Sequence, residues 1–197
     1  MQTRFMYNQS VLEEIKNIFL KNQHSIAVAE SVTSGHLQAA LSSAENASKF
    51  FQGGITAYNL GQKTKHLQVE PIHADSCNCV SEKIAVQMAL EVTTLFTSDW
   101  GIAITGYAAP VPECSIHNLF AYYAITYQKK LLQVKKITAA IENPIAVQIH
   151  YVNHILGDFV ELLRKGQFQS SFSINDLNSI NSRLASAGPL STSPSIE

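Results

Sequence analysis

The hydroxyl side chains that follow a short apolar run are the first residues of this sequence with chemical potential. Residues 26–29, Ile-Ala-Val-Ala, have no polar face, as expected of a strand covered on both sides. Ser31, Thr33 and Ser34 come directly after this run and precede a helix predicted to extend to about residue 41. A serine at such a turn is presented at the edge of the sheet, where free N–H groups of the following helix can stabilise an oxyanion. The alternative is that these residues only cap the helix, since Ser and Thr favour helix starts.

Two patterns of histidine and cysteine residues could form metal sites. His150 and His154 have the four-residue spacing of zinc ligands on a helix, but Tyr151 stands where a metalloprotease has its glutamate. A second set of possible ligands consists of His66, His73, Cys77 and Cys79, whereas Cys114 is expected to be an ordinary thiol. Their spacing matches no common zinc module. We therefore predict no metal site and no cofactor.

Composition restricts the class of protein. The 197 residues are 46% apolar and 15% charged, with a formal net charge of −1, which is typical of one domain with a sizeable core. Without a basic run, nucleic acid and anionic membranes are not expected partners. Three cysteines and no apolar stretch of signal-peptide length favour the cytoplasm. The apolar composition suggests a homo-oligomer.

Hydrophobic periodicity predicts helices alternating with short buried strands, followed by a hairpin and a long helix. The predicted helices cover about residues 11–21, 35–41, 62–67, 82–96 and 144–163, and the predicted strands cover 26–29, 55–58, 100–105, 120–126 and 131–137. Ser10 and Glu13 have the spacing of a capping box for the first helix. This pattern predicts a three-layer α/β/α sandwich with a mixed sheet over residues 1–166. Residues 167–197, rich in Ser and Asn, are predicted to form a flexible tail.

Four sequence blocks occur in a characteristic order. Residues 29–35 read Ala-Glu-Ser-Val-Thr-Ser-Gly, and residues 54–63 keep a glycine, a tyrosine and a lysine at fixed separations. Val-Ser-Glu follows at residues 80–82, and Ile-Thr-Gly at residues 104–106. In their order and spacing, these blocks resemble the CinA C-terminal family of nicotinamide-nucleotide amidohydrolases, over about residues 8–165.

The resemblance implies an α/β/α fold and hydrolysis of a small-molecule amide or nucleotide, with ammonia released from nicotinamide mononucleotide in family members of known activity. It assigns Ser31 as the nucleophile, Lys63 as its base and Tyr58 as an assisting group. It also implies a set of substrate-binding residues, namely Glu30, Thr33, Gly35, Thr105 and Gly106. A lysine acts as a base only when it is neutral, which requires a pKa lowered by burial or by a nearby positive charge.

Two features depart from the family pattern. Residues 107–113, Tyr-Ala-Ala-Pro-Val-Pro-Glu, replace a glycine-rich loop, and residues 143–149 contain no arginine. Side chains and proline rings remove room and N–H donors that glycines offer to a ligand. Two interpretations stay open at this point. The protein is either an amidohydrolase with an altered pocket, or a catalytically degenerate relative with a binding, oligomerisation or regulatory role.

Overall fold

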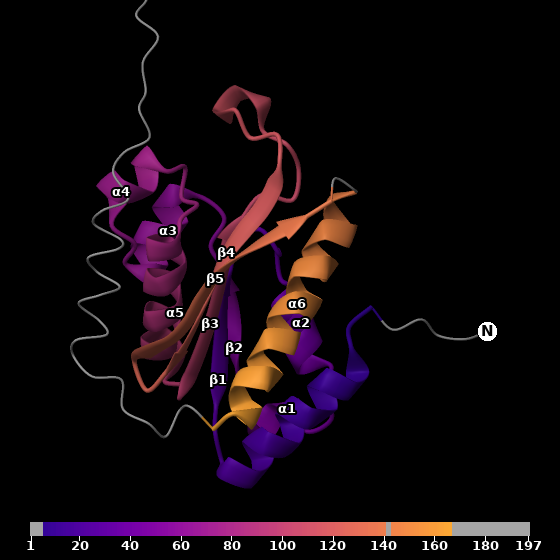
Figure 1. Ribbon diagram of the computed structural model, residues 1–197. Helices are drawn as coiled ribbons and strands as arrows, with labels where there is room; N and C mark the ends of the chain where they lie inside the picture. The colour runs from indigo at the N-terminus through magenta and orange to yellow at the C-terminus, as the bar shows by residue number, and fades with distance from the viewer. Residues whose placement is uncertain (1–5, 141–142, 167–197) are drawn as a thin grey trace, which may run out of the picture.

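The computed structural model describes residues 6–140 and 143–166, and a five-stranded sheet forms the centre of this part of the chain (Figure 1). The strand order is β2-β1-β3-β4-β5. The strands are β1 (Ile26–Glu30), β2 (Phe51–Thr56), β3 (Trp100–Gly106), β4 (Leu119–Tyr127) and β5 (Lys130–Ala139). β1 pairs in parallel with β2 and β3, whereas β4 is antiparallel to both β3 and β5. The predicted mixed sheet is therefore confirmed.

Helices cover both faces of the sheet, as predicted for a three-layer sandwich (Figure 1). One layer contains α1 (Gln9–Asn22), α2 (His36–Ser42) and α6 (Pro144–Arg164). The other contains α3 (Leu60–Leu67), α4 (Pro71–Ser76) and α5 (Glu82–Phe96). Two short 3-10 helices, η1 (Ala47–Lys49) and η2 (Pro112–Cys114), lie in connections. Within the described ranges, no helix combines the length and the apolar character needed to cross a membrane.

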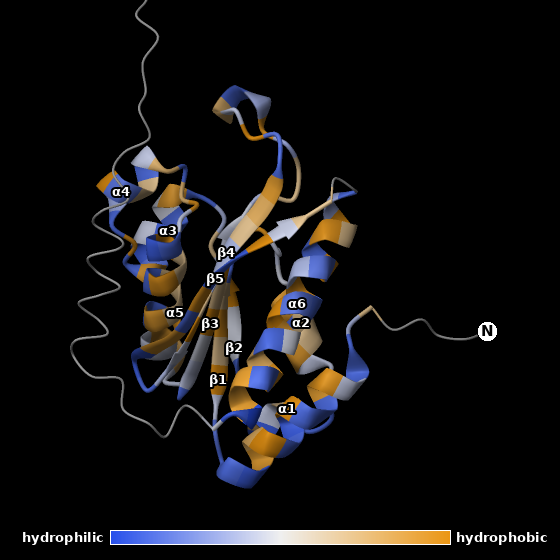
Figure 2. Ribbon diagram, viewed as in Figure 1, coloured by the Kyte–Doolittle hydropathy of each residue, from blue (hydrophilic) through white to orange (hydrophobic). Residues whose placement is uncertain are grey.

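The two sides of the sheet differ in side-chain size. In β1, Ile26 and Val28 pack into the core shared with α1, α2 and α6, whereas Ala27 and Ala29 face the layer that contains α5. Successive strand residues point to opposite faces, so a strand buried on both sides reads as a continuous apolar run. This explains why these strands show no polar alternation in the sequence. Figure 2 shows the apolar sides of the helices turned toward the sheet.

The position of β2 corrects one prediction. The strand covers Phe51–Thr56 rather than residues 55–58. Gly54 indicated the beginning of the strand in the sequence, but it lies inside the strand, where α2 comes very close. A Cβ atom at Gly54 would lie 2.7 Å from both the Val28 carbonyl oxygen and Gln38 Cγ. The tyrosine predicted to end this strand therefore lies beyond it, in the connection to α3.

Helix starts give a second correction. α1 begins at Gln9, because the side chain of Asn8 accepts a hydrogen bond from Val11 N at 3.3 Å. The predicted capping box of Ser10 and Glu13 is therefore wrong. α4 was not predicted from the sequence. It is only six residues long and starts after Glu70, whose carboxylate accepts two backbone N–H bonds. A helix of fewer than two turns is too short to show periodicity.

Side-chain caps and a tight turn define the ends of further elements. Ser81 and Asn143 are the N-caps of α5 and α6. The predicted hairpin joins β4 to β5 through Gln128 and Lys129, which both have positive φ angles, of 47° and 60°. Two successive positive φ values are typical of a two-residue hairpin turn that matches the twist of its strands.

The carboxylate of Glu30 fixes the connection between β1 and α2. Glu30 ends β1 and has no exposed surface. Its carboxylate accepts hydrogen bonds from Thr33 Oγ1 at 2.5 Å and from the backbone N–H groups of Gly35, Leu37 and Gln38 at 3.2, 2.9 and 2.8 Å. Gly35 has a φ of 102°, a conformation that residues with a side chain rarely adopt. The donors at the start of α2 are therefore used to hold the turn in shape.

We predict that Glu30→Gln lowers the free energy of unfolding by about 2 kcal/mol, because one acceptor oxygen becomes an N–H₂ group that faces buried donors. Urea denaturation followed by circular dichroism measures this change. The matched control is Glu70→Gln, at a half-buried cap with two backbone donors, where we expect a loss of about 1 kcal/mol or less. An equal loss in both variants would contradict the importance of the Glu30 network.

Candidate active site

Three chain segments meet beyond the carboxyl ends of the parallel strands. The turn after β1, the connection after β2 and the loop after β3 contribute Ser31, Tyr58 and Tyr107 to one pocket of about 570 Å³. α3, α4 and the first turn of α6 supply further parts of its wall. Ligands of open α/β sheets usually bind at this edge.

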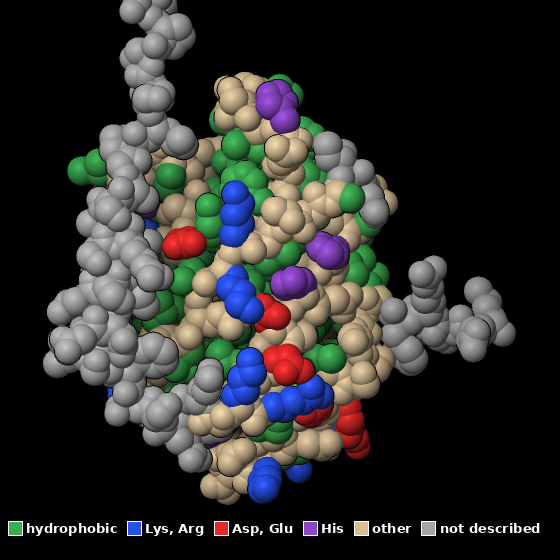
Figure 3. Space-filling model, viewed as in Figure 1, with side chains coloured by type: hydrophobic (Ala, Val, Ile, Leu, Met, Phe, Trp, Pro, Cys, Tyr) green, Lys and Arg blue, Asp and Glu red, His purple; other side chains and the backbone are tan. Residues whose placement is uncertain are grey.

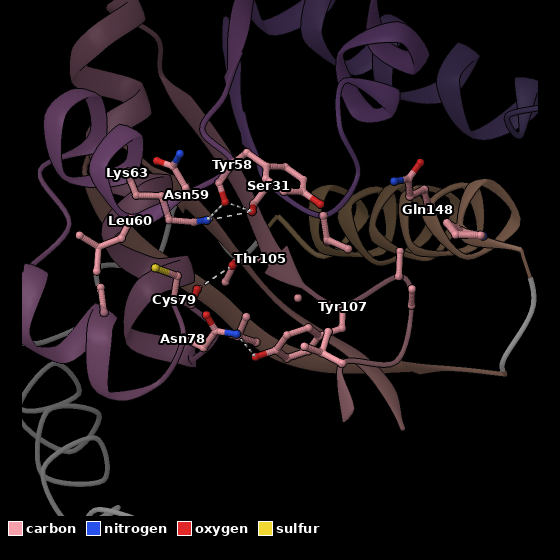
Figure 4. A pocket seen from close by; sticks show the side chains of 18 of the residues that line it. Ser31, Tyr58, Asn59, Leu60, Lys63, Asn78, Cys79, Thr105, Tyr107 and Gln148 are labelled. Atoms are coloured by element: carbon pink, nitrogen blue, oxygen red, sulfur yellow. Dashed lines mark hydrogen bonds between the residues drawn. The ribbon is translucent and has the colours of Figure 1, made fainter. Parts of the chain in front are cut away.

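Ser31 and Lys63 are in direct contact at the bottom of this pocket (Figure 4). The Nζ atom of Lys63 lies 2.9 Å from Ser31 Oγ. Lys63 belongs to α3 and is 1% exposed, and Ser31 is 5% exposed. The backbone carbonyl of Tyr58 accepts a hydrogen bond from Lys63 Nζ at 2.9 Å and a longer one from Ser31 Oγ at 3.5 Å. One main-chain oxygen thus holds both side chains.

The surroundings of Lys63 favour its neutral form. Burial lowers the pKa of the Lys63 amine, and the Cys79 thiol opposes this only in part. In the part of the chain that the structure describes, no carboxylate forms an ion pair with Lys63. Loss of water therefore disfavours the charged amine without a counter-charge to restore it. A neutral amine carries the lone pair that proton abstraction from a serine requires.

The side chain of Tyr58 is exposed, whereas its backbone carbonyl contacts the Ser31 and Lys63 side chains. It is 71% exposed, and Figure 4 shows the ring pointing away from the Lys63 amine. Its hydroxyl makes no hydrogen bond to any residue within 6–140 and 143–166. Tyr58 therefore contacts Ser31 and Lys63 through its carbonyl oxygen. Residue type alone gives no signal for such a main-chain contact.

The five predicted substrate-binding residues fall into two groups. Thr105 and Gly106 line the pocket, and the Thr105 hydroxyl donates to a backbone carbonyl of the α4–α5 connection at 2.7 Å. The pocket wall does not include Glu30, Thr33 or Gly35, which form the hydrogen-bond network behind the turn. Their position supports a role in shaping the turn that presents the serine.

The backbone N–H groups available to stabilise an oxyanion differ from those expected from the sequence. The first N–H groups of α2 were predicted to be free, but three of them donate to Glu30. Among the described residues, the backbone N–H groups of Val32 and Thr33 have no protein acceptor. Val32 lines the pocket directly after Ser31, so its N–H is the available donor nearest in sequence.

Sequence reasoning missed the opposite wall of the pocket. Asn78 Nδ2 donates to the Tyr107 hydroxyl at 3.2 Å, and the Tyr151 hydroxyl donates to the Tyr107 carbonyl at 3.0 Å. These contacts fix the start of the divergent loop against α6 and the α4–α5 connection. Ala109 and Gln148 also line this wall. None of these residue types signals a binding site by itself.

The possible metal ligands are not brought together. Within residues 6–140 and 143–166, no group of three His, Cys, Asp or Glu side chains is arranged to hold a metal ion. His73 instead contacts Ser81 Oγ at 3.0 Å, and His66 contacts a glutamine of its own helix. The ring centroids of His150 and His154 are 6.3 Å apart.

Comparison with solved structures places the fold among known proteins. The competence damage-inducible protein A of Klebsiella pneumoniae superimposes with a TM-score of 0.75 at 23% identity, covering 80% of this chain and 98% of that chain. A competence-damaged protein (CinA) superfamily member from Escherichia coli gives a TM-score of 0.72 at 25% identity, covering 82% and 94% of the two chains.

Sequence comparison gives a consistent result. A CinA-like protein of Picosynechococcus is 43% identical over 101 residues, which are 51% of this chain and 24% of that protein. A CinA-like protein of Amoebophilus asiaticus is 36% identical over 105 residues. The chain spans about a quarter of the length of these curated relatives. The family model described as the CinA C-terminal domain matches residues 8–118, and the chain therefore belongs to the CinA C-terminal domain family.

Proposed function

We propose that this protein hydrolyses a carboxamide, with Ser31 as the nucleophile and neutral Lys63 as its base. The observation that carries the proposal is the 2.9 Å contact between Ser31 Oγ and a buried lysine amine that has no counter-charge among the described residues. A nucleophile and base within hydrogen-bond reach, with the base oriented by a third group, is the arrangement that activates a serine. The third group here is the carbonyl of Tyr58.

The first half of the proposed reaction forms an acyl-enzyme. Ser31 Oγ attacks the amide carbon while its proton passes to Lys63 Nζ, and the backbone N–H of Val32 stabilises the negative oxygen that develops. Lys63 then gives this proton to the amide nitrogen. The carbon–nitrogen bond breaks and ammonia leaves, so that Ser31 carries the acyl group as an ester.

The second half releases the acid. Lys63, neutral again, takes a proton from a water molecule that attacks the ester carbon. The ester bond breaks, and the proton held by Lys63 returns to Ser31 Oγ. In sum, one amide and one water give one carboxylic acid and one ammonia, and no redox step or cofactor is required.

The first substrate to test is nicotinamide mononucleotide, because the resemblance to the amidohydrolases of this family suggests it. Release of ammonia from nicotinamide mononucleotide and from a panel of other carboxamides by pure protein is the direct assay. Turnover of any member supports the proposal. No turnover across the panel would favour the alternative of a catalytically degenerate protein with a binding, oligomerisation or regulatory role, which the divergent loop at residues 107–113 motivates.

We predict that Ser31→Ala and Lys63→Ala each lower kcat by about 10³-fold or more, and that the double variant is little worse than either, because groups acting as one unit are not additive. Lys65→Ala, on the exposed side of the same helix, is the matched control and should keep normal turnover. Tyr58→Phe should cost less than about 10-fold, because the carbonyl that holds the pair remains.

The same assay has a clear contrary result. Near-normal turnover by folded Ser31→Ala would mean that the serine is only part of the turn.

Turnover should also survive EDTA, since the proposed nucleophile is a side-chain oxygen. Reversible loss on chelation would instead indicate a metal-dependent reaction.

A further inference from the structure

The charged groups of the pocket wall are few. Among the Asp, Glu, Lys, Arg and His residues of the described ranges, only Lys63 and Asp75 line the pocket. In the proposed reaction Lys63 is neutral, which leaves the Asp75 carboxylate as the fixed charge. The described part of the pocket wall is therefore neutral to negative.

The cationic side chains near β5 and α6 lie outside the pocket wall. Figure 3 shows lysine and arginine side chains interspersed with carboxylates over β5 and α6. Lys135 lies 2.8 Å from Asp158, and Arg164 lies 2.6 Å from Glu14. None of these residues lines the pocket. Their charges are compensated locally.

The wall also offers few arrangements suited to a phosphate. A phosphate carries a charge of about −1.5 to −2 and is bound by arginine, lysine or a helix N-terminus. α6 presents Pro144 to the pocket, which has no N–H, while Asn143 accepts from Ala146 N at 2.9 Å. Gln148, one turn further along, is neutral. Desolvation of a phosphate here would be poorly compensated.

Other features of the wall suit a flat ring or a cation. Figure 4 shows the rings of Tyr58 and Tyr107 on opposite sides of the space in front of Lys63. Aromatic faces attract cations, and Asp75 adds a negative charge on α4. Asp75 is exposed and lines the same pocket as the two tyrosines.

We infer that this pocket selects a carboxamide on an uncharged or cationic body without a phosphate, and that it discriminates against the phosphate ester of the same compound. The inference rests on the proposed function for the reaction itself, but the selection is a property of binding. It can therefore be measured separately from turnover.

Nicotinamide riboside and nicotinamide mononucleotide form a suitable pair of probes, because they share the amide, the cationic ring and the ribose, and differ only in the phosphate. Binding of each to the Ser31→Ala protein is measured by calorimetry, and ammonia release is measured with the unaltered protein. We expect the riboside to bind at least about 10-fold more tightly than the mononucleotide and to have the higher kcat/KM. A tenfold difference in Kd corresponds to about 1.4 kcal/mol of binding free energy.

A charge-introducing variant tests the cause of this selection. Gln148→Arg places a guanidinium on the wall and should shift the binding ratio toward the mononucleotide by about 10-fold, whereas the neutral Gln148→Met should not. Circular dichroism checks that both variants are folded. An unchanged ratio in a folded Gln148→Arg protein would contradict the electrostatic explanation.

The outcomes separate the two proposals. Equal or tighter binding of the mononucleotide overturns the inference and leaves the proposed reaction standing if ammonia is released. Preferred binding of the riboside without ammonia release supports the selection and counts against the reaction. Absence of binding by both compounds overturns the inference and removes this amide as a substrate.

Discussion

The site depends on one lysine amine being kept out of water. Lys63 is buried against Ser31 and a main-chain carbonyl, and burial lowers the pKa of its amine below the ordinary 10.5. The folded chain therefore holds this proton less tightly than the unfolded chain. Consequently, Lys63 makes the free energy of unfolding rise with pH between its folded pKa and 10.5, and it reduces stability below that range. The rest of the fold must supply the stability that this residue removes.

The sheet topology brings the reacting side chains together, and backbone groups do most of the positioning. Two adjacent parallel strands end at the same edge, so the turn after β1 and the helix after β2 bring Ser31 and Lys63 together. The preceding residue, Glu30, uses the donors of α2 to fix the turn, which leaves the N–H of Val32 available. The Tyr58 carbonyl then aligns both side chains. Backbone geometry supplies much of this preorganisation, which is the main requirement for electrostatic catalysis.

The sequence predicted the layered fold and its mixed sheet, because buried runs, helical periodicity and hairpin residues each leave a clear signal. It misplaced β2, because Gly54 looked like a strand boundary and only the close approach of α2 explains its position inside the strand. The residues around Ser31, Lys63 and Tyr58 were identified through the family resemblance, but the main-chain contact between them has no signature in residue type. The predicted flexible tail, residues 167–197, lies outside the described residues.

The most direct test of this account is an NMR titration of Lys63 in the folded protein, with its Cε–H signal assigned by comparison with Lys63→Met. The account predicts a titration midpoint below the ordinary lysine value of 10.5, because burial penalises the charged amine and no described carboxylate compensates. The Lys63→Met protein, which lacks this amine, serves as the control. A Lys63 midpoint at or above 10.5 would show a permanently charged amine, and Lys63 would then not be the base.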